Sequence, residues 1–320
     1  MLILSSEAIE KAAPPHLWTD VMELALKASA DKDYFTPDRM HVEMDGNTLL
    51  VMPSVGPDMF TTKLVSVFPG NAELGEPVIH GTVLLNEGRT GEAVALLNGA
   101  KLTAMRTAAV ASVGVRHLTD PLMHSIGVIG AGAQGRHIAW LAAHERDIER
   151  IYVYDRSIMM VQEFLNFMAE RLPNVEVAVC EDEQQLVKNS EAIITATTSE
   201  IPVLPNLEDL LLGKTIISVG SYKPNMRELP ESLFRLIDQV WIDADHGRKE
   251  SGDLIFPVEN KLIQSEQIRH IADLIENPQE ISFRETRLFK TVGQGLFDLF
   301  AAKLVYERAR LDGIGQSVKV

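Results

Sequence analysis

The stretch Ser125-Ile126-Gly127-Val128-Ile129-Gly130-Ala131-Gly132-Ala133-Gln134-Gly135 decides the fold of this 320-residue chain. Its first five residues form a short apolar run, which is typical of a buried parallel strand. The next six have the spacing Gly-x-Gly-x-x-Gly, and a helical pattern continues from Gly135 to about His144. A strand, a glycine loop and a helix in this order predict a dinucleotide-binding unit.

Each glycine of this loop has a separate physical role. Gly130 permits the tight turn, Gly132 lets the backbone approach a pyrophosphate, and Gly135 lets the helix pack closely on the strand. Free N–H groups at the start of the helix, together with the helix dipole, attract the anion. We therefore expect the cofactor phosphates to lie against Gly130, Gly132, Ala133, Gln134 and Gly135.

Asp155 ends the next predicted strand, Ile151–Tyr154, at the spacing where a carboxylate meets the adenosine ribose hydroxyls. This carboxylate favours NAD, because it would repel the 2′-phosphate of NADP. Arg156 follows directly and could bind that phosphate if the Asp155 side chain turned away. The residues therefore predict NAD or NADP, with Asp155 and Arg156 both in the cofactor site.

The rest of the chain predicts two domains. Further strand-like runs alternate with helical stretches and indicate a doubly wound parallel sheet; they cover residues 175–179, 192–196, 215–219 and 240–243. Before them, short strands separated by turns indicate a smaller, largely antiparallel sheet; they cover residues 48–53, 61–68, 81–86 and 93–97. Helices are expected at about 19–32, 102–118, 159–171 and 295–311. The expected fold is α/β, with a discontinuous α+β domain (1–118 and 295–320) and a Rossmann domain (119–294).

Composition excludes several classes of function. The formal net charge of −15 repels nucleic-acid backbones and anionic lipids, so neither nucleic acid nor a membrane is an expected partner. Cys180 is the only cysteine, which rules out an intramolecular disulfide and a thiolate metal cluster.

Residues 1–7 lack the features of a signal peptide, and no apolar run approaches the roughly 18 residues of a membrane span. We expect a cytoplasmic protein. We also expect no metal site. Four histidines do not have the spacing of metal ligands along the chain: His80, His117, His137 and His246.

Residues 66–109 closely resemble the ornithine cyclodeaminase/μ-crystallin family, above all in Leu102-Thr103-Ala104-Met105-Arg106-Thr107-Ala108-Ala109. Glu250-Ser251-Gly252-Asp253-Leu254 and Phe289-Lys290-Thr291-Val292-Gly293 carry the same resemblance, which covers nearly the whole chain. It implies hydride transfer at the α-carbon of an amino or imino acid. It also implies that the first domain binds the substrate and forms a homodimer.

The resemblance assigns Lys63, Arg106 and Arg39 to the carboxylate of the substrate. The chemistry agrees, because arginine can clamp a carboxylate with two hydrogen bonds while lysine adds a point charge. The alternative for these three residues is an ordinary solvated cation. Contacts to the cofactor are implied for Thr107, Thr197, Val219 and Lys290, and for Lys290 a solvated surface lysine is the alternative.

Tyr222 marks a departure from the family pattern. Ornithine cyclodeaminases carry an aspartate in the stretch that corresponds to residues 219–229, and Tyr222 stands in its place. Cyclodeamination needs a carboxylate that binds the side-chain amine and exchanges protons near neutral pH. A phenol, which ordinarily loses its proton near pH 10, is a poor replacement. Ornithine cyclodeamination is therefore disfavoured, and Tyr222 is a candidate proton donor or a pocket wall.

Reduction of a cyclic imine remains the leading hypothesis. The expected reaction takes Δ1-pyrroline-2-carboxylate to L-proline, with NADH or NADPH as hydride donor. Its piperideine homologue would give L-pipecolate, because one methylene is worth only about 1–3 kcal/mol of discrimination. An amino-acid dehydrogenase is the alternative among enzymes, and a non-catalytic binding protein like μ-crystallin is the alternative from another class. Retention of Lys63 and Arg106 argues against a pure binding protein.

Overall fold

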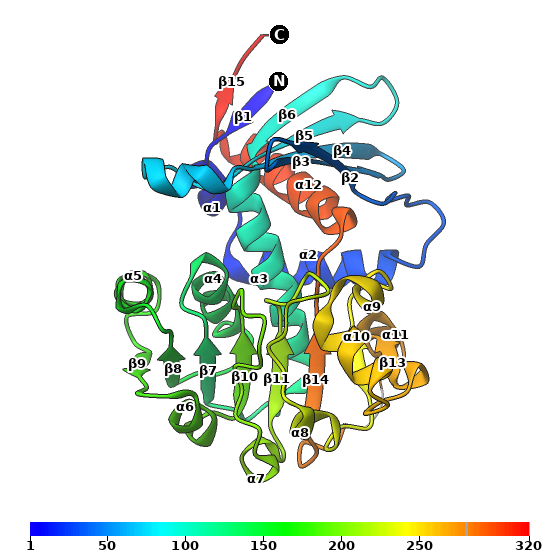
Figure 1. Ribbon diagram of the computed structural model, residues 1–320. Helices are drawn as coiled ribbons and strands as arrows, with labels where there is room; N and C mark the ends of the chain where they lie inside the picture. The colour runs from blue at the N-terminus through cyan, green and yellow to red at the C-terminus, as the bar shows by residue number, and fades with distance from the viewer. Residues whose placement is uncertain (279–280, 320) are drawn as a thin grey trace. The chain divides into compact units, whose positions relative to one another are not determined.

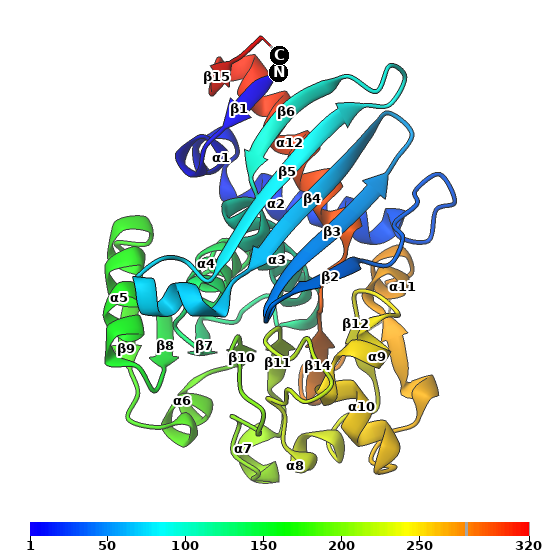
Figure 2. The same ribbon diagram turned by 45° about the horizontal axis from the view of Figure 1, so that its top comes forward.

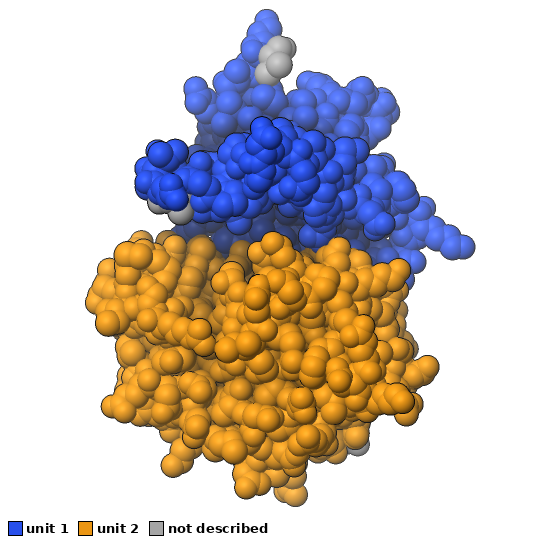
Figure 3. Space-filling view, viewed as in Figure 1, with its two compact units in different colours: residues 1–106, 294–320 blue, residues 107–293 orange. Residues whose placement is uncertain are grey.

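The computed structural model describes residues 1–278 and 281–319, and its contacts divide the chain into two compact units (Figure 3). Unit 1 consists of Met1–Arg106 and Gln294–Val320, and unit 2 of Thr107–Gly293. The sequence-based division at residue 118 assigned the whole of helix α3 (Gly99–Leu118) to the first domain, whereas the contacts divide this helix after Arg106. An unbroken helix has no local signal for such a boundary, because its hydrogen-bond pattern runs straight through it.

Unit 2 is built on an eight-stranded sheet with the order β13-β12-β14-β11-β10-β7-β8-β9 (Figure 1). Neighbouring strands are parallel. The chain runs outward from β7 to β9 and then returns to β10 on the other side of β7, which creates a topological switch point between β7 and β10. The bounds are β7 Ser125–Ile129, β8 Arg150–Tyr154, β9 Glu176–Val179, β10 Ala192–Thr195, β11 Thr215–Ser218, β12 Val240–Ile242, β13 Ile268–His270 and β14 Arg287–Lys290.

Helices lie on both faces of this sheet, as Figures 1 and 2 show, so its central strands are buried on both sides. Local capping explains where several helices begin: the Ser157 hydroxyl accepts from Met160 N, and the Asp182 carboxylate accepts from Gln185 N. The bounds are α4 Ala133–Ala142, α5 Ile158–Arg171, α6 Glu183–Asn189, α7 Glu208–Leu211, α8 Glu231–Phe234, α9 Gly247–Glu250, α10 Gly252–Glu259 and α11 Ile271–Glu276, with a 3-10 helix at Ser265–Gln267. The predicted doubly wound α/β fold is confirmed.

Unit 1 holds a seven-stranded sheet with the order β15-β1-β6-β5-β4-β3-β2. It is antiparallel except for the pairing of β1 with β6. Helix α12 (Gly295–Asp312) packs on β3, β4 and β5 and on helix α2 (Pro15–Ala28), so the last part of the chain completes the core of the first. The other bounds are β1 Leu2–Leu4, α1 Ser6–Ala12, β2 Met40–Met44, β3 Asn47–Val55, β4 Met59–Val67, β5 Ile79–Glu87, β6 Ala93–Asn98 and β15 Gln316–Ser317, with a 3-10 helix at Pro69–Leu74.

No helix within residues 1–278 and 281–319 combines enough length with enough apolar character to span a membrane.

Candidate active site

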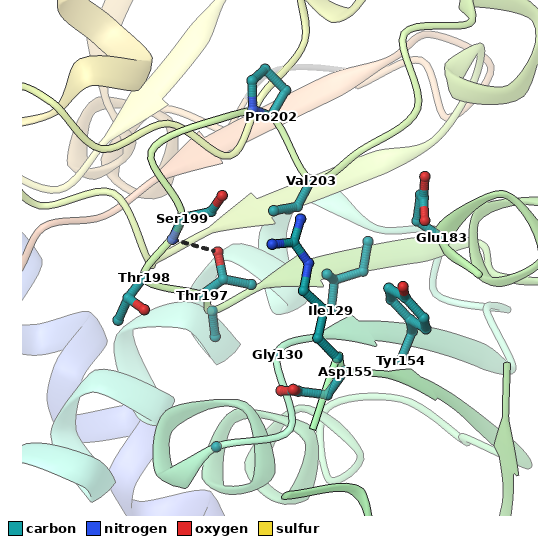
Figure 4. A pocket seen from close by; sticks show the side chains of 13 residues that line it. Ile129, Gly130, Tyr154, Asp155, Glu183, Thr197, Thr198, Ser199, Pro202 and Val203 are labelled. Carbon is teal, nitrogen blue, oxygen red and sulfur yellow. Dashed lines mark hydrogen bonds between the residues drawn. The ribbon is translucent and has the colours of Figure 1, made fainter. Parts of the chain in front are cut away.

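A groove of about 440 Å³ lies at the carboxyl ends of β7, β8 and β10 (Figure 4). This is the switch point of the unit 2 sheet, where open α/β sheets bind their ligands. Glycine-loop residues line one part of the groove, and the segment that follows β10 lines another. The lining residues are Ile129, Gly130, Gly132, Tyr154, Asp155, Arg156, Glu183, Ala196, Thr197, Thr198, Ser199, Pro202 and Val203.

The three glycines of the loop are required for different reasons. Gly130 has a φ of +102°, and a Cβ there would lie 2.6 Å from the Ala196 carbonyl oxygen. A Cβ on Gly135 would lie 1.8 Å from the Gly130 carbonyl oxygen. A Cβ on Gly132, in contrast, would meet no atom of the described residues within 4 Å. The fold itself therefore needs Gly130 and Gly135, whereas Gly132 keeps space free for a ligand.

The start of helix α4 fits the pyrophosphate of a dinucleotide. Ala133 and Gln134 are its first two residues, so their backbone N–H groups lack partners within the helix. The Gln134 Oε1 atom is buried and has no hydrogen-bond partner within residues 1–278 and 281–319, which leaves this acceptor available to a donor group of a ligand. The free N–H groups and the open space beside Gly132 predict anion binding at this helix end.

Asp155 joins the end of β8 to the glycine loop. One carboxylate oxygen, Oδ2, accepts from Ala131 N at 2.7 Å, and Oδ1 accepts from Ser157 N at 2.8 Å. Each carboxylate oxygen can accept a second hydrogen bond, so these contacts leave acceptor capacity for a ribose hydroxyl. Arg156 is exposed and lines the same groove. Asp155, which was predicted to favour NAD, and Arg156, which was predicted to accommodate NADP, therefore line the same groove.

Thr197 and Val219 lie just beyond the ends of β10 and β11. Thr197 lines the groove, and its N and Oγ1 atoms donate to the buried Glu228 carboxylate at 2.7 and 2.8 Å. Val219 N donates to the Thr195 carbonyl at 2.9 Å, which continues the pairing of the two strands. Thr197 is thus positioned at the groove by a side chain that the sequence analysis did not single out.

A second cluster of charged side chains lies inside unit 1. Strand β4 directs Lys63 into the core, where its Nζ atom donates to Asp298 Oδ2 at 2.8 Å and to Thr103 Oγ1 at 3.4 Å. Arg106 on helix α3 brings its Nε atom within 3.3 Å of Asp298 Oδ1. The three charged residues are 1–7 % exposed. The structure therefore brings the predicted pair Lys63 and Arg106 together and adds Asp298 on helix α12.

The unit 1 cluster carries an excess of positive charge, because two cations share one carboxylate. Arg106 Nε and Asp298 Oδ1 each lack a hydrogen bond, although they are 3.3 Å apart. Burial lowers the pKa of the Lys63 ammonium to about 8; Arg106 and Arg39 add to this, while the Asp298 carboxylate opposes it. A buried cluster with an unsatisfied arginine donor and surplus positive charge is suited to bind a small carboxylate.

The remaining predicted site residues differ in their surroundings. Thr107 is nearly buried on helix α3, beside Arg106. Tyr222 is 42 % exposed, and Lys223 Nζ lies 5.7 Å from the centre of its ring. Lys290, at the end of β14, is 1 % exposed, and its Nζ atom donates to the Ser218 and Thr291 carbonyls. That burial excludes the alternative of a solvated surface lysine.

Replacing Gly132 with alanine should separate cofactor binding from folding. The added methyl group meets no atom of the chain but occupies the space expected for the pyrophosphate, so we expect NADH affinity to fall about tenfold or more. Fluorescence titration with NADH measures this, and the melting temperature should not change. Gly70→Ala is the matched control, because its Cβ also meets no atom within 4 Å. Unchanged NADH binding by Gly132→Ala would show that the loop does not hold the cofactor.

A Rossmann sheet with a Gly-x-Gly-x-x-Gly loop and a groove at its switch point defines a nicotinamide-dependent oxidoreductase. The model of the ornithine cyclodeaminase/mu-crystallin family matches residues 2–313, and the chain belongs to this family.

Three relatives illustrate the similarity. A Δ1-pyrroline-2-carboxylate reductase of Bacillus cereus is 31 % identical over the full length of both chains. The ketimine reductase mu-crystallin of Mus musculus is 29 % identical over 80 % of this chain and 79 % of its own. A solved structure of the Thermococcus litoralis Δ1-pyrroline-2-carboxylate reductase, in complex with NADH and L-proline, has a TM-score of 0.91 and 31 % identity. It covers 99 % of this chain and 100 % of the relative.

These findings confirm the predicted family, and the NADH in the solved relative agrees with the predicted nicotinamide cofactor. The assignment of individual site residues rests on the geometry described above.

Proposed function

We propose that this protein uses NADH or NADPH to reduce Δ1-pyrroline-2-carboxylate to L-proline. The observation that carries the proposal is the buried cluster of Lys63, Arg106 and Asp298, whose surplus positive charge suits one small carboxylate. The reductases of that name among the relatives support the same substrate. The piperideine homologue is a second substrate, because one methylene changes the binding energy by only about 1–3 kcal/mol.

The proposed mechanism depends on positioning. Arg106 and Lys63 bind the substrate carboxylate, and this fixes the neighbouring α-carbon, which is the atom that accepts the hydride. The reduced nicotinamide supplies that hydride when bound. Asp298 holds Lys63 in place and favours its charged form. The imine nitrogen takes its proton from water or from the Tyr222 hydroxyl, so one hydride and one proton convert C=N to CH–NH.

A panel of substrates separates this proposal from its alternatives. We expect rapid oxidation of NADH or NADPH, followed at 340 nm, with both cyclic imines. We expect far slower reduction of the oxidised cofactor with alanine, and no ammonia release from ornithine, because Tyr222 replaces the carboxylate that cyclodeamination requires. Cofactor binding without any turnover would instead support a non-catalytic binding protein.

The pH dependence of substrate binding should reflect Lys63. Its pKa in the free protein is about 8, so the ammonium is charged at pH 7 and becomes largely neutral above pH 9. Loss of this charge weakens carboxylate binding, and we expect the inhibition constant of pyrrole-2-carboxylate to rise about tenfold from pH 7 to pH 9.5. This analogue keeps its own charge throughout that range. A Lys63→Arg variant should lose most of this dependence; an equally steep rise in that variant would assign the titration to another group.

We also propose that unit 1 forms a homodimer through the face of its sheet opposite helix α12. In the strand register Met40, Val51 and Leu64 lie side by side on that face, which is turned toward the viewer in Figure 2. Several of its apolar side chains are 39–60 % exposed: Met40, Val42, Met44, Val55 and Leu64. A continuous apolar patch of this kind is typical of a protein–protein interface.

The assembly state tests this face directly. We expect the wild-type protein to elute with the mass of two chains in light-scattering chromatography. A Leu64→Lys variant should shift to one chain at micromolar concentration, because it places a charge in the apolar patch. Leu122→Lys is the control, since Leu122 is an exposed apolar residue of unit 2. A dimer that persists unchanged in Leu64→Lys would contradict this assignment.

The proposed reaction consumes reduced cofactor, and we place it in the cytoplasm, where cells regenerate that cofactor. The single cysteine agrees with a reducing compartment, because Cys180 is buried as a free thiol and burial raises its pKa.

A further inference from the structure

Glu228 is the centre of a buried polar network at the carboxyl ends of β10 and β11. It is 0 % exposed, and its carboxylate accepts five hydrogen bonds. The donors are Thr195 Oγ1, Thr197 N, Thr197 Oγ1, Ser218 Oγ and Gly220 N, at 2.7–3.2 Å. Five donors match an ionised carboxylate, which only accepts hydrogen bonds. Glu228 therefore places a fixed negative charge beneath the loops that follow these strands.

Two further carboxylates and one ammonium share this region. Asp253 is 0 % exposed; its Oδ1 atom accepts from Glu228 N and Leu229 N, and its Oδ2 atom lies 3.4 Å from Ser218 Oγ. Asp243, which follows β12, accepts from Thr291 Oγ1 and Gly293 N. Lys290 is attracted by all three carboxylates, Asp253, Glu228 and Asp243.

We call Glu228, Asp253, Asp243 and Lys290 the buried anionic cluster. Its three carboxylates and one ammonium are all buried, and together they carry more negative than positive charge when all four are ionised. Burial raises the pKa of Asp253 to about 6, with Lys290 opposing the rise, and Asp253 is therefore charged at pH 8.

The position of this cluster in the sheet relates it to one half of the cofactor. The glycine loop after β7 and Asp155 after β8 occupy the side of the switch point that takes the adenosine half. A dinucleotide bound in this way would cross to the other side, and its nicotinamide half would lie over the ends of β10 and β11. Thr195 and Ser218, which end those strands, both donate to Glu228. The negative charge would thus lie beneath the half of the cofactor whose ring is positive when oxidised and neutral when reduced.

We propose that the buried anionic cluster stabilises the positively charged ring of the oxidised cofactor and thereby makes the reduced cofactor a stronger hydride donor. The charge of the cluster is buried and poorly screened by water. It therefore stabilises the positively charged oxidised ring more than the neutral reduced ring. The inference rests on the proposed reduction, in which the protein must release a hydride from the nicotinamide. Asp253, Glu228 and Lys290 are positioning and electrostatic residues in this account.

The test compares the affinities of NAD⁺ and NADH, or of the NADP pair if the protein prefers it, at pH 8. Asp253→Asn removes one charge but keeps an oxygen to accept from Glu228 N and Leu229 N. We expect it to weaken NAD⁺ binding about three- to thirtyfold relative to NADH, because a buried unit charge is only weakly screened. Ser218→Ala is the matched control, because it removes a hydroxyl that contacts both Glu228 and Asp253 without changing any charge. Its affinity ratio should stay within about twofold of wild type.

Lys290→Met removes a positive charge from the cluster. It should therefore strengthen the binding of NAD⁺ relative to that of NADH. Calorimetry gives both dissociation constants, and circular dichroism shows whether each variant is folded. If Lys290→Met does not fold, the comparison of Asp253→Asn with Ser218→Ala still tests the role of the buried anionic cluster. An unchanged ratio in Asp253→Asn, or equal shifts in Asp253→Asn and Ser218→Ala, would overturn the inference. Absence of imine reduction by the wild-type protein would instead refute the proposed function, and the affinity ratios would be unaffected by that result.

Discussion

Replacing Arg106 with alanine is expected to raise the KM for the cyclic imino acid about a hundredfold, because it removes the guanidinium that we propose forms two charge-assisted hydrogen bonds with the substrate carboxylate. Each such bond is worth roughly 1.5–3 kcal/mol, so their joint loss exceeds the effect of any single neutral contact. NADH affinity should not change, since the cofactor groove lies in unit 2 and is lined by other residues. Initial-rate kinetics and an NADH titration measure the two quantities.

The conservative replacement Arg106→Lys sharpens this prediction. It keeps the positive charge but loses the planar two-pronged geometry, so it should recover only part of the affinity, about tenfold. Equal KM values for wild type and Arg106→Ala would show that the substrate carboxylate binds elsewhere.

Replacing Asp298 with asparagine is expected to destabilise the protein by about 3 kcal/mol, because it leaves Lys63 and Arg106 buried without a counter-charge. Lys63 should respond by losing its proton more readily, which also weakens substrate binding at pH 7. Urea unfolding followed by fluorescence measures the loss of stability, and the change in KM measures the effect on the site.

The ion pair between Lys303 and Asp58 offers a matched control for that variant. This pair also joins helix α12 to the sheet region of unit 1, with Lys303 Nζ 3.2 Å from Asp58 Oδ2. The Asp58 side chain, however, is 75 % exposed. Asp58→Asn should therefore change stability by less than about 0.5 kcal/mol. Similar stability losses for Asp58→Asn and Asp298→Asn would mean that the buried cluster has no special energetic role.

The sequence predicts the core of the fold because its signals are local. The run at 125–135 contains a whole strand, loop and helix start, and the predicted strands at 192–196 and 215–219 match β10 and β11 closely. Strand β14 was not predicted, since Arg287-Leu288-Phe289-Lys290 has only two apolar residues between charged ones. Its central place between β11 and β12 depends on long-range pairing, which no local pattern reveals.

In the candidate site too, residues that meet only through long-range contacts could not be predicted from local sequence patterns. Lys63 and Arg106 could be assigned because the family motif contains them, whereas Asp298 lies in an apolar helix outside that motif. One signal was available: Asp298 shares a helix face with Ala301, Ala302 and Val305, all buried, and an acid on such a face needs a buried cation. Glu228 gave no signal, because its five hydrogen bonds come from two other segments of the chain, residues 195–197 and 218–220.

The most direct measurement of the central claim is the transfer of deuterium from cofactor to product. The protein is incubated with Δ1-pyrroline-2-carboxylate and NADH or NADPH that carries deuterium at the transferable C4 position, and the product is analysed by mass spectrometry and NMR. We expect L-proline with one deuterium at its α-carbon, formed in equal amount to the cofactor oxidised. Oxidised cofactor without labelled proline, or no reaction while the cofactor still binds, would contradict the proposed reduction.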